Sequence, residues 1–270
     1  MKKFRMLIVI ALLLSTLLIS GCSGILVTRN GDADLGEKET RQYDITEFTN
    51  VDIGSAFSYE IIQSDTPSIS IMAYDNMFDD ISVTKEGQTL MIEKEGPWTM
   101  FNIGIDGVDM PKAIISMPLL RNLNSSGATN GVVSGFSSMK TLDITVSGAS
   151  SVELVEISYG DIYLNISGAS DVIGALETGD IEIDVSGASS IQLEGDANDI
   201  DIKADGASHL KLSDFTVNDA SVILSGATDC TLNMDGRLDA DLSGASRLEY
   251  IGEPTLGEID ISGASNIGRK

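Results

Sequence analysis

From residue 43 onward, apolar and polar residues alternate with the two-residue period of β-strands. Short alternating runs occupy 51–53, 59–61 and 68–71. Residues 81–93 hold two further runs on either side of the polar segment 85–88, which predicts a β-hairpin. After the N-terminal apolar run, no stretch shows the 3.6-residue period of an amphipathic helix. The pattern therefore predicts an all-β body.

The second half of the chain repeats one tetrapeptide, Ser-Gly-Ala-Ser or a near copy of it. Successive copies start 21, 20, 19, 19, 20, 18 and 19 residues apart. The copies begin at Ser126, Ser147, Ser167, Ser186, Asp205, Ser225, Ser243 and Ser262. A period near 20 residues with strand-like flanks is typical of a solenoid, in which each coil buries its apolar side against its neighbours.

Alignment of the repeats on the tetrapeptide separates inward from outward positions. The residues one and three positions before it are mostly aliphatic, whereas the residue between them is mostly polar. Another mostly aliphatic column follows the tetrapeptide and comprises Gly131, Val152, Val172, Ile191, Leu210, Cys230, Leu248 and Ile267. Because successive side chains of a strand point to opposite faces, we expect a strand on each side of the tetrapeptide and a narrow corner at its Gly-Ala pair.

These columns predict a right-handed parallel β-helix, or β-solenoid, with about 20 residues per coil, preceded by a smaller β segment. With coils about 4.8 Å apart, eight coils would form a rod about 40 Å long. The bulky side chains of Phe57, Phe78, Trp98 and Phe101 suit a cap that closes one end. We divide the chain into a signal peptide (1–21), a lipid-anchored flexible tether (22–42), an N-terminal β segment or cap (43–120) and the repeat solenoid (121–270).

The N-terminus has the three-part pattern of a secretory signal peptide. Lys2, Lys3 and Arg5 precede the apolar run 6–14, and small residues lead to Cys22. A cysteine directly after Ser-Gly resembles a bacterial lipobox, which implies that Cys22 becomes the lipid-modified first residue of the mature protein. The alternatives are an ordinary signal peptide with an incidental cysteine, or a transmembrane anchor, for which the apolar run falls short of about 20 residues. We expect an exported, membrane-anchored bacterial lipoprotein and leave open the side of the membrane that its body faces.

The charge balance restricts the partners. Without the three signal-peptide cations, 14 Lys and Arg face 41 Asp and Glu, about 27 net negative charges. Such a surface repels nucleic acids and anionic lipids, so the expected contact with the membrane is through the N-terminal lipid. If Cys22 is acylated, Cys230 has no partner for an intrachain disulfide, and the exported domain must be stabilised by its core.

The order of lipobox, mixed β segment and Ser-Gly-Ala-Ser coils resembles one family of bacterial envelope proteins. The matching stretches are residues 48–53, the apolar run around 118–120, and the repeated tetrapeptides. They are similar to the auto-transporter adhesin, head GIN domain family. The resemblance implies a β-solenoid of the cell envelope, and it supplies no catalytic or binding residues to transfer.

No residue constellation predicts a catalytic centre or a cofactor. His209 is the single histidine and falls in an outward column, so a surface histidine is the simplest interpretation. Cys230 falls in an inward column, which predicts a buried, inert thiol. The fourth tetrapeptide position repeats a hydroxyl residue through the coils, which we interpret as a hydrogen-bonding ladder, because repeated serines indicate packing more than a single nucleophile.

Acidic columns provide the one metal hypothesis. Stacking would place Asp241 above Asp260, and Asp239 above Glu258. Like charges about 5 Å apart repel, and a divalent cation such as calcium would relieve the repulsion by oxygen ligation. The competing interpretation is that these carboxylates are hydrated and prevent edge-to-edge aggregation. We favour hydration, because the Gly-Gly-x-Gly-x-Asp calcium repeat does not occur.

The sequence favours a non-enzymatic cell-envelope lipoprotein that serves as an adhesin or as a surface-binding or scaffold module for an unknown envelope or surface ligand. The alternative is a carbohydrate-active enzyme that processes polysaccharides, since parallel β-helices often host such enzymes. Nearly constant coil length and few aromatic residues argue against it. A regulatory role within the envelope stays open. The end of the solenoid near 270 predicts self-association or partner docking through unpaired strand edges.

Overall fold

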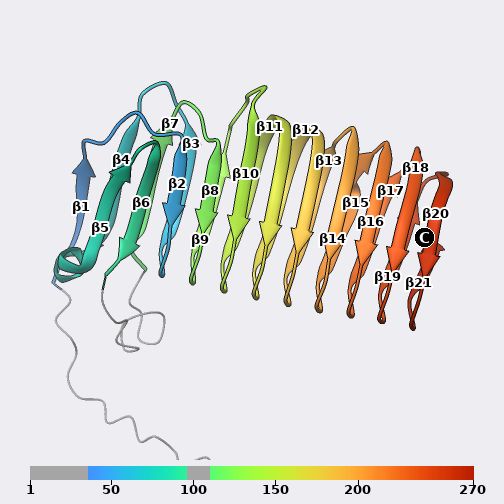
Figure 1. Ribbon diagram of the computed structural model, residues 1–270. Helices are drawn as coiled ribbons and strands as arrows, with labels where there is room; N and C mark the ends of the chain where they lie inside the picture. The colour runs from blue at the N-terminus through green and yellow to red at the C-terminus, as the bar shows by residue number, and fades with distance from the viewer. Residues whose placement is uncertain (1–35, 96–109) are drawn as a thin grey trace, which may run out of the picture. The chain divides into compact units, whose positions relative to one another are not determined.

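The computed structural model describes residues 36–95 and 110–270, which lie within one compact unit, Leu35–Lys270. This unit is nearly all-β, with 65% strand and 3% helix, and contains a parallel β-solenoid of about seven turns of about 20 residues (Figure 1). The predicted fold class is therefore confirmed. The predicted signal peptide, Cys22, Trp98 and Phe101 lie outside the described residues.

The strands form two stacks, and each coil contributes a strand to both. The first stack contains the strands that precede the corners, in spatial order β5 (Ile81–Glu86), β6 (Thr89–Lys94), β2 (Asn50–Ile53), β8 (Asn122–Ser125), β10 (Thr141–Val146), the second halves of β11 (Ser151–Ile166) and β12 (Asp171–Val185), β14 (Asp199–Ala204), β16 (Asp219–Leu224), β18 (Arg237–Leu242) and β20 (Thr255–Ile261).

The second stack contains the strands that follow the corners. Its spatial order is β1 (Lys38–Tyr43), β4 (Ser68–Tyr74), β7 (Lys112–Met117), β3 (Ser58–Gln63), β9 (Asn130–Ser134), the first halves of β11 and β12, β13 (Ser190–Asp196), β15 (His209–Val217), β17 (Asp229–Met234), β19 (Arg247–Ile251) and β21 (Asn266–Arg269). The pairs β1–β4, β4–β7 and β5–β6 are antiparallel, and the regular coils pair in parallel.

The Ser-Gly-Ala-Ser tetrapeptides form the tight corners between the stacks. In each corner the glycine has a positive φ, for example 81° at Gly187, and the next alanine donates its amide to the carbonyl of the glycine one coil earlier. Ala188 N lies 2.8 Å from Gly168 O, and Ala207 N lies 2.7 Å from Gly187 O. A Cβ atom on Gly187 would overlap the Gly168 carbonyl oxygen. Glycine is thus required both by the backbone angle and by the close stacking of corners.

A further corner stacks beneath the first tetrapeptide and comes from the segment predicted as a cap. It is Gly54-Ser55-Ala56-Phe57, between β2 and β3. Ala128 N donates to Ser55 O at 2.6 Å, as in the regular corners, and Ser55 takes the glycine position with φ 67°. The β2–β3 coil lies between the coil formed by β6 and β7 and the coil formed by β8 and β9. Chain order and stacking order therefore differ at this end.

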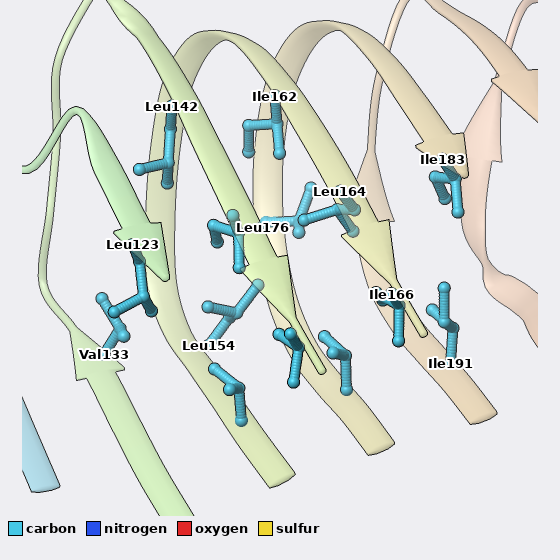
Figure 2. Packing of buried hydrophobic residues seen from close by; sticks show 14 of the residues in the cluster. Leu123, Val133, Leu142, Leu154, Ile162, Leu164, Ile166, Leu176, Ile183 and Ile191 are labelled. Atoms are coloured by element: carbon cyan, nitrogen blue, oxygen red, sulfur yellow. The ribbon is translucent and has the colours of Figure 1, made fainter. Parts of the chain in front are cut away.

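The interior between the stacks is filled by aliphatic side chains from the predicted inward columns. Figure 2 shows Leu164, Ile166, Ile183 and Ile191 among these residues, and each is at most 2% exposed. Burial of this kind stabilises the fold by about 25 cal/mol per Å² of apolar surface. Each coil alone could bury little, so the core forms only when coils stack.

Two positions of the inward columns, Ser125 and Gly131, lack the usual aliphatic side chain because of the buried Tyr59. Tyr59 reaches across the interior and donates its hydroxyl to Ser125 Oγ at 3.0 Å, and Ser125 Oγ lies 2.6 Å from Thr129 Oγ1. A Cβ atom on Gly131 would overlap the Tyr59 ring. The ring thus occupies the space that an aliphatic side chain fills in other coils. Burial raises the pKa of the Tyr59 phenol far above its ordinary value.

The N-terminal end of the solenoid is covered. The 3-10 helix η1 (Asp75–Asp80) buries Met77 and Phe78 against the core. The β5–β6 hairpin has Gly87-Gln88 as its turn, which confirms the hairpin that the sequence predicted. Phe57 is also buried, at the corner between β2 and β3. The predicted cap is thus an integral part of the solenoid.

Strand pairing crosses two of the predicted segment boundaries. Strand β1 begins at Lys38, so the last residues of the segment predicted as a tether (22–42) pair with β4. The segments 43–120 and 121–270 belong to one compact unit, because β2 and β3 pair with β8 and β9 across the predicted boundary. Alternation predicted the strands, but it contained no information on which strands pair.

Candidate functional site: an acidic depression on the second stack

A depression on the second stack arises from differences in coil length. At one point of β11 the two residues Val155 and Glu156 lie opposite the single residue Ala175 of β12. Two coils further on, Leu193 of β13 lies opposite two residues of β15, 212 and 213. The β12 and β13 coils are thus one residue shorter than the coils on either side. This matches the tetrapeptide spacings of 20, 19, 19 and 20 residues in this part of the chain.

The shorter coils form the floor of a cavity of about 660 Å³. We call this cavity the acidic depression; it is lined by Glu156, Ile157, Ser158, Ala175, Leu176, Glu177, Glu194, Gly195 and Asp214. The side chains of Ile157 and Leu176 are buried beneath it, whereas the four acidic residues are exposed. A smaller hollow of about 240 Å³ shares Ala175 and Glu194 and adds Glu153 to its lining. The result is an open concave surface with a negative rim above two buried apolar side chains.

Two backbone features allow the bend at this surface. Glu156 adopts φ 54°, a left-handed conformation that costs a non-glycine residue about 1–2 kcal/mol. Gly195 has φ 114°, and a Cβ atom there would overlap the Leu176 carbonyl oxygen. Bulges of this kind re-aim side chains at a strand surface.

The acidic rim is not neutralised by nearby cations. Among the described residues, neither Lys nor Arg forms an ion pair with Glu156, Glu177, Glu194 or Asp214. Lys211, on the neighbouring β15, lies 3.4 Å from the Gln192 amide oxygen. The first stack differs, because Lys203 Nζ contacts Glu182 there at 2.9 Å. The rim is therefore free to interact with a positively charged group.

The acidic columns, for which a cation site was considered and hydration favoured, contain an ion pair between Arg237 and Asp239. Asp241 and Asp260 are in register on β18 and β20. Asp239 accepts two hydrogen bonds from Arg237, each of 2.6 Å, and one from the Glu258 amide at 2.6 Å. These contacts lower the pKa of Asp239 to about 2. Among the described residues, no group of three or more His, Cys, Asp or Glu side chains is arranged to hold a metal ion.

The remaining candidates occupy structural positions. His209 is exposed on β15. Cys230 is 2% exposed, and burial raises the pKa of its thiol to about 12, which makes it a poor nucleophile. Tyr159, another buried group, donates its hydroxyl to Leu120 O at 2.6 Å, and its pKa is raised to about 12, chiefly by burial. None of these three groups lines the acidic depression.

The repeated hydroxyls form hydrogen bonds within their corners and, for some of them, to backbone groups of the neighbouring coil, so the predicted ladder is present in part. Each one bonds within its own corner: Ser150 Oγ donates to Ser147 O at 2.9 Å, and Ser246 Oγ donates to Ser243 O at 2.7 Å. Some also accept an amide of the preceding coil, such as Thr129 N to Ser150 Oγ at 3.2 Å. Coils about 4.8 Å apart place equivalent hydroxyls beyond the roughly 2.7 Å of a direct O–H···O bond. The hydroxyls therefore stabilise the corners.

The spacing of the tetrapeptides contained a signal for the depression that our sequence interpretation missed. Coil length was taken as nearly constant, yet two consecutive 19-residue spacings, from Ser167 to Asp205, lie between spacings of 20 residues. A one-residue deletion on an outer bend lowers the surface locally and leaves the inward columns in register. The position of the missing residue within the coil follows only from the strand pairing.

The architecture defines this chain as a parallel β-solenoid protein with a packed interior, whose candidate binding surface lies on its exterior. A profile of the family described as "Putative auto-transporter adhesin, head GIN domain" matches residues 47–254. The chain belongs to this family, as its sequence resemblance indicated. No curated protein sequence matches the chain.

Solved structures with the same fold include proteins of Parabacteroides species. A protein of Parabacteroides distasonis described as a putative lipid binding protein superimposes with a TM-score of 0.78 and 20% identity, over 87% of this chain and 97% of that one. A putative adhesin of the same species gives a TM-score of 0.78 and 18% identity, over 87% and 98% of the two chains. A putative adhesin of Parabacteroides merdae gives 0.77 and 19%, over 87% and 97%. At this level of identity the similarity establishes the fold.

Membership of this adhesin-like family is consistent with an extracellular or envelope-associated protein. Within the described ranges, 36–95 and 110–270, the structure contains no helix that is both long and apolar enough to span a membrane.

Proposed function

We propose that this protein is a non-enzymatic binding module of the bacterial cell envelope and that the acidic depression is its ligand-binding surface. The observation that carries the proposal is a set of four carboxylates around a concave surface, none of which forms an ion pair with another described residue. Family membership supports a surface-binding role. Catalysis by positioned acid and base groups is not needed for such a role, which requires only a rigid, accessible surface.

The chemistry of the depression favours a cationic ligand with an apolar part, such as a lysine-rich segment of an envelope protein. Exposed carboxylates attract ammonium and guanidinium groups, and the open concave surface can accept an extended lysine or arginine side chain. The excess of negative charge over the whole chain would increase the rate of association with such a ligand. Aromatic side chains, which sugar-processing grooves use for stacking, are missing from the lining, so the depression suits binding better than polysaccharide processing.

Removal of the rim charges tests the binding surface. We expect Glu177→Gln/Glu194→Gln/Asp214→Asn to weaken binding of the probe peptide hexalysine roughly tenfold, since each exposed charge pair contributes about 0.2–1 kcal/mol. Isothermal titration calorimetry at low ionic strength, where screening is weak, measures the change.

The matched control removes the same number of exposed carboxylates from the first stack. In Asp143→Asn/Asp201→Asn/Asp241→Asn the net charge falls equally but the depression is intact. Hexalysine affinity close to that of the parent protein is expected for this variant. An equal loss in both variants would show that the peptide senses only net charge and would contradict a specific surface.

The proposal also places the solenoid on the membrane through an acylated Cys22. We expect metabolic labelling with radioactive palmitate to mark the protein and Cys22→Ser to abolish the label. Protease added to intact cells distinguishes an exposed solenoid, which is released, from one that faces a protected compartment. Labelling of Cys22→Ser at the parent level would contradict the anchor, and complete protection would contradict a role in adhesion to other cells.

A further inference from the structure

One tyrosine projects from the outer face of the first stack, in the second half of β11. Tyr163 is 45% exposed, which makes it the most exposed aromatic residue of the described ranges. The next residue, Leu164, is 2% exposed and points into the interior (Figure 2). Strand register places Asp143 of β10 on one side of Tyr163 and Glu182 of β12 on the other. An exposed ring on a rigid strand offers a large contact area to a ligand at low cost in conformational entropy.

Tyr163 lines a hollow of about 360 Å³ that begins at Asn122 on β8 and crosses the coils of β10, β11 and β12. A second hollow, of about 270 Å³, shares Asn165 and Asp184 with the first and reaches Ile223 on β16. We call the two hollows together, from Asn122 to Ile223, the outer groove. Five steps between coils, each about 4.8 Å, give it a length of about 24 Å along the solenoid.

Polar side chains beside the exposed tyrosine keep their hydrogen-bonding capacity for a ligand. Among the described residues, no side-chain hydrogen bond joins Asn122, Thr145 or Asn165 to a partner within the groove. Asn124 differs, although it belongs to the same outward column as Thr145 and Asn165, because its amide donates to Asp52 Oδ1 at 3.1 Å. A side-chain amide both donates and accepts, so the amides in the groove can pair with hydroxyl groups in either direction.

The charges of the outer groove disfavour an anionic ligand. Lys203 is the one cation among the described residues that line it, and its ammonium group contacts Glu182 at 2.9 Å. Asp143 and Asp184 add negative charge to the lining. An anionic chain would therefore be repelled. An uncharged sugar suits the remaining chemistry, because its C–H face can pack on an aromatic ring while its hydroxyls pair with amides and carboxylates.

We propose that the outer groove binds a neutral glycan chain, laid along the solenoid axis, with one pyranose ring stacked on Tyr163. Asn165 and Asp143 bond the hydroxyls of this sugar and of its neighbour. Successive coils repeat at a distance close to the length of one sugar unit, which favours an extended chain over a single sugar. The groove lies on the first stack and the acidic depression on the second, so this inference does not depend on the proposed function of the depression.

Isothermal titration calorimetry with three neutral hexasaccharides, cellohexaose, mannohexaose and chitohexaose, tests the groove. We expect at least one of them to bind, and Tyr163→Ala to weaken its binding about tenfold or more, as for a central aromatic contact. Tyr163→Phe keeps the ring and should retain most of the affinity. Ile173→Ala is the control, because Ile173 is exposed to a similar degree, 39%, but lies on the second stack. It should leave glycan affinity unchanged.

A pair of asparagines tests the hydrogen bonds. Asn165→Ala should weaken glycan binding about threefold to tenfold, the range for one lost hydrogen bond. Asn124→Ala should not, because Asn124 lies in the same column but outside the groove. A rise in sodium chloride from about 50 to about 500 mM should leave glycan affinity unchanged, whereas it should weaken hexalysine binding to the acidic depression.

Three results would overturn the proposal. The first is no heat of binding with any of the three hexasaccharides up to about 10 mM, well above a dissociation constant of about 1 mM. The second is glycan binding that Tyr163→Ala leaves unchanged, which would place the glycan elsewhere. The third is a loss of hexalysine affinity in Tyr163→Ala without any glycan binding, which would assign the groove to cationic ligands.

Discussion

Gly187→Ala lowers the free energy of unfolding by about 3 kcal/mol or more, the largest effect that we expect from a single methyl group in this protein. Two costs combine at this corner. A left-handed backbone costs alanine about 1–2 kcal/mol, and overpacking in a rigid environment costs about 1–3 kcal/mol. Both apply, because Gly187 has φ 81° and an added Cβ would overlap the Gly168 carbonyl oxygen. Urea unfolding followed by circular dichroism measures the loss.

Gly135→Ala separates the two costs. Gly135 also has a positive φ, 74°, but nothing lies within 4 Å of a Cβ atom built on it. The substitution should therefore cost only the backbone part, about 1–2 kcal/mol. If both variants lost the same amount, the close stacking of corners would not contribute to stability. The regular Ala-to-Gly hydrogen bonds between corners would then be a consequence of the fold and not one of its causes.

Phe215→Ala is the second substitution with a large expected effect. Phe215 is 0% exposed on β15, lies in register with Gly195 of β13, and follows Asp214 of the acidic depression. It fills the interior behind the bulge that forms the depression. Truncation of a buried phenylalanine to alanine typically costs about 3–5 kcal/mol, because part of the cavity persists. Thermal and urea unfolding of the variant measure this loss.

The control for Phe215 is an aromatic residue on the outside of the solenoid. Tyr163 is 45% exposed on the first stack, so Tyr163→Ala should change the free energy of unfolding by less than about 1 kcal/mol. Phe215→Leu, which keeps most of the volume, should lose clearly less than Phe215→Ala. A loss for Phe215→Ala as small as that for Tyr163→Ala would mean that the coils behind the depression repack freely.

Much of the solenoid was predictable because every repeat must satisfy the same packing and backbone requirements. Every coil needs aliphatic residues at the same inward positions and a glycine at the same corner, so eight copies report one local geometry. Val152, Val172 and Ile191 in the predicted inward column are buried, as expected. The hairpin at Gly87 was predictable for a related reason, because two alternating runs flank a short polar turn.

The coil formed by β2 and β3 was not recognised, because it departs from the repeat at the informative positions. Ser55 stands where other corners have glycine, and Phe57 stands where they have a hydroxyl residue. It also stacks on a coil whose corner lies about 70 residues later in the chain. Register between strands so distant in sequence depends on how the whole N-terminal segment folds, which alternation does not describe.

The candidate site likewise combines features that the sequence suggested with features that only the structure revealed. The sequence led us to examine His209, Cys230 and the acidic columns near Asp239, and the structure places none of them in the acidic depression. Exposed Glu177 and Glu194 resemble many other surface carboxylates in this acidic chain. They become a site only because shortened coils bring them around Leu176.

The sequence by itself determined the repeating unit: a strand, a Gly-Ala corner, another strand and the inward aliphatic columns. These features depend on side-chain alternation and on local backbone angles, which neighbouring residues set. Only the tertiary structure determined the stacking order at the N-terminal end and the acidic depression. Those features depend on which coils become neighbours and on one-residue differences between them, and such differences acquire a position in space only when the strands pair.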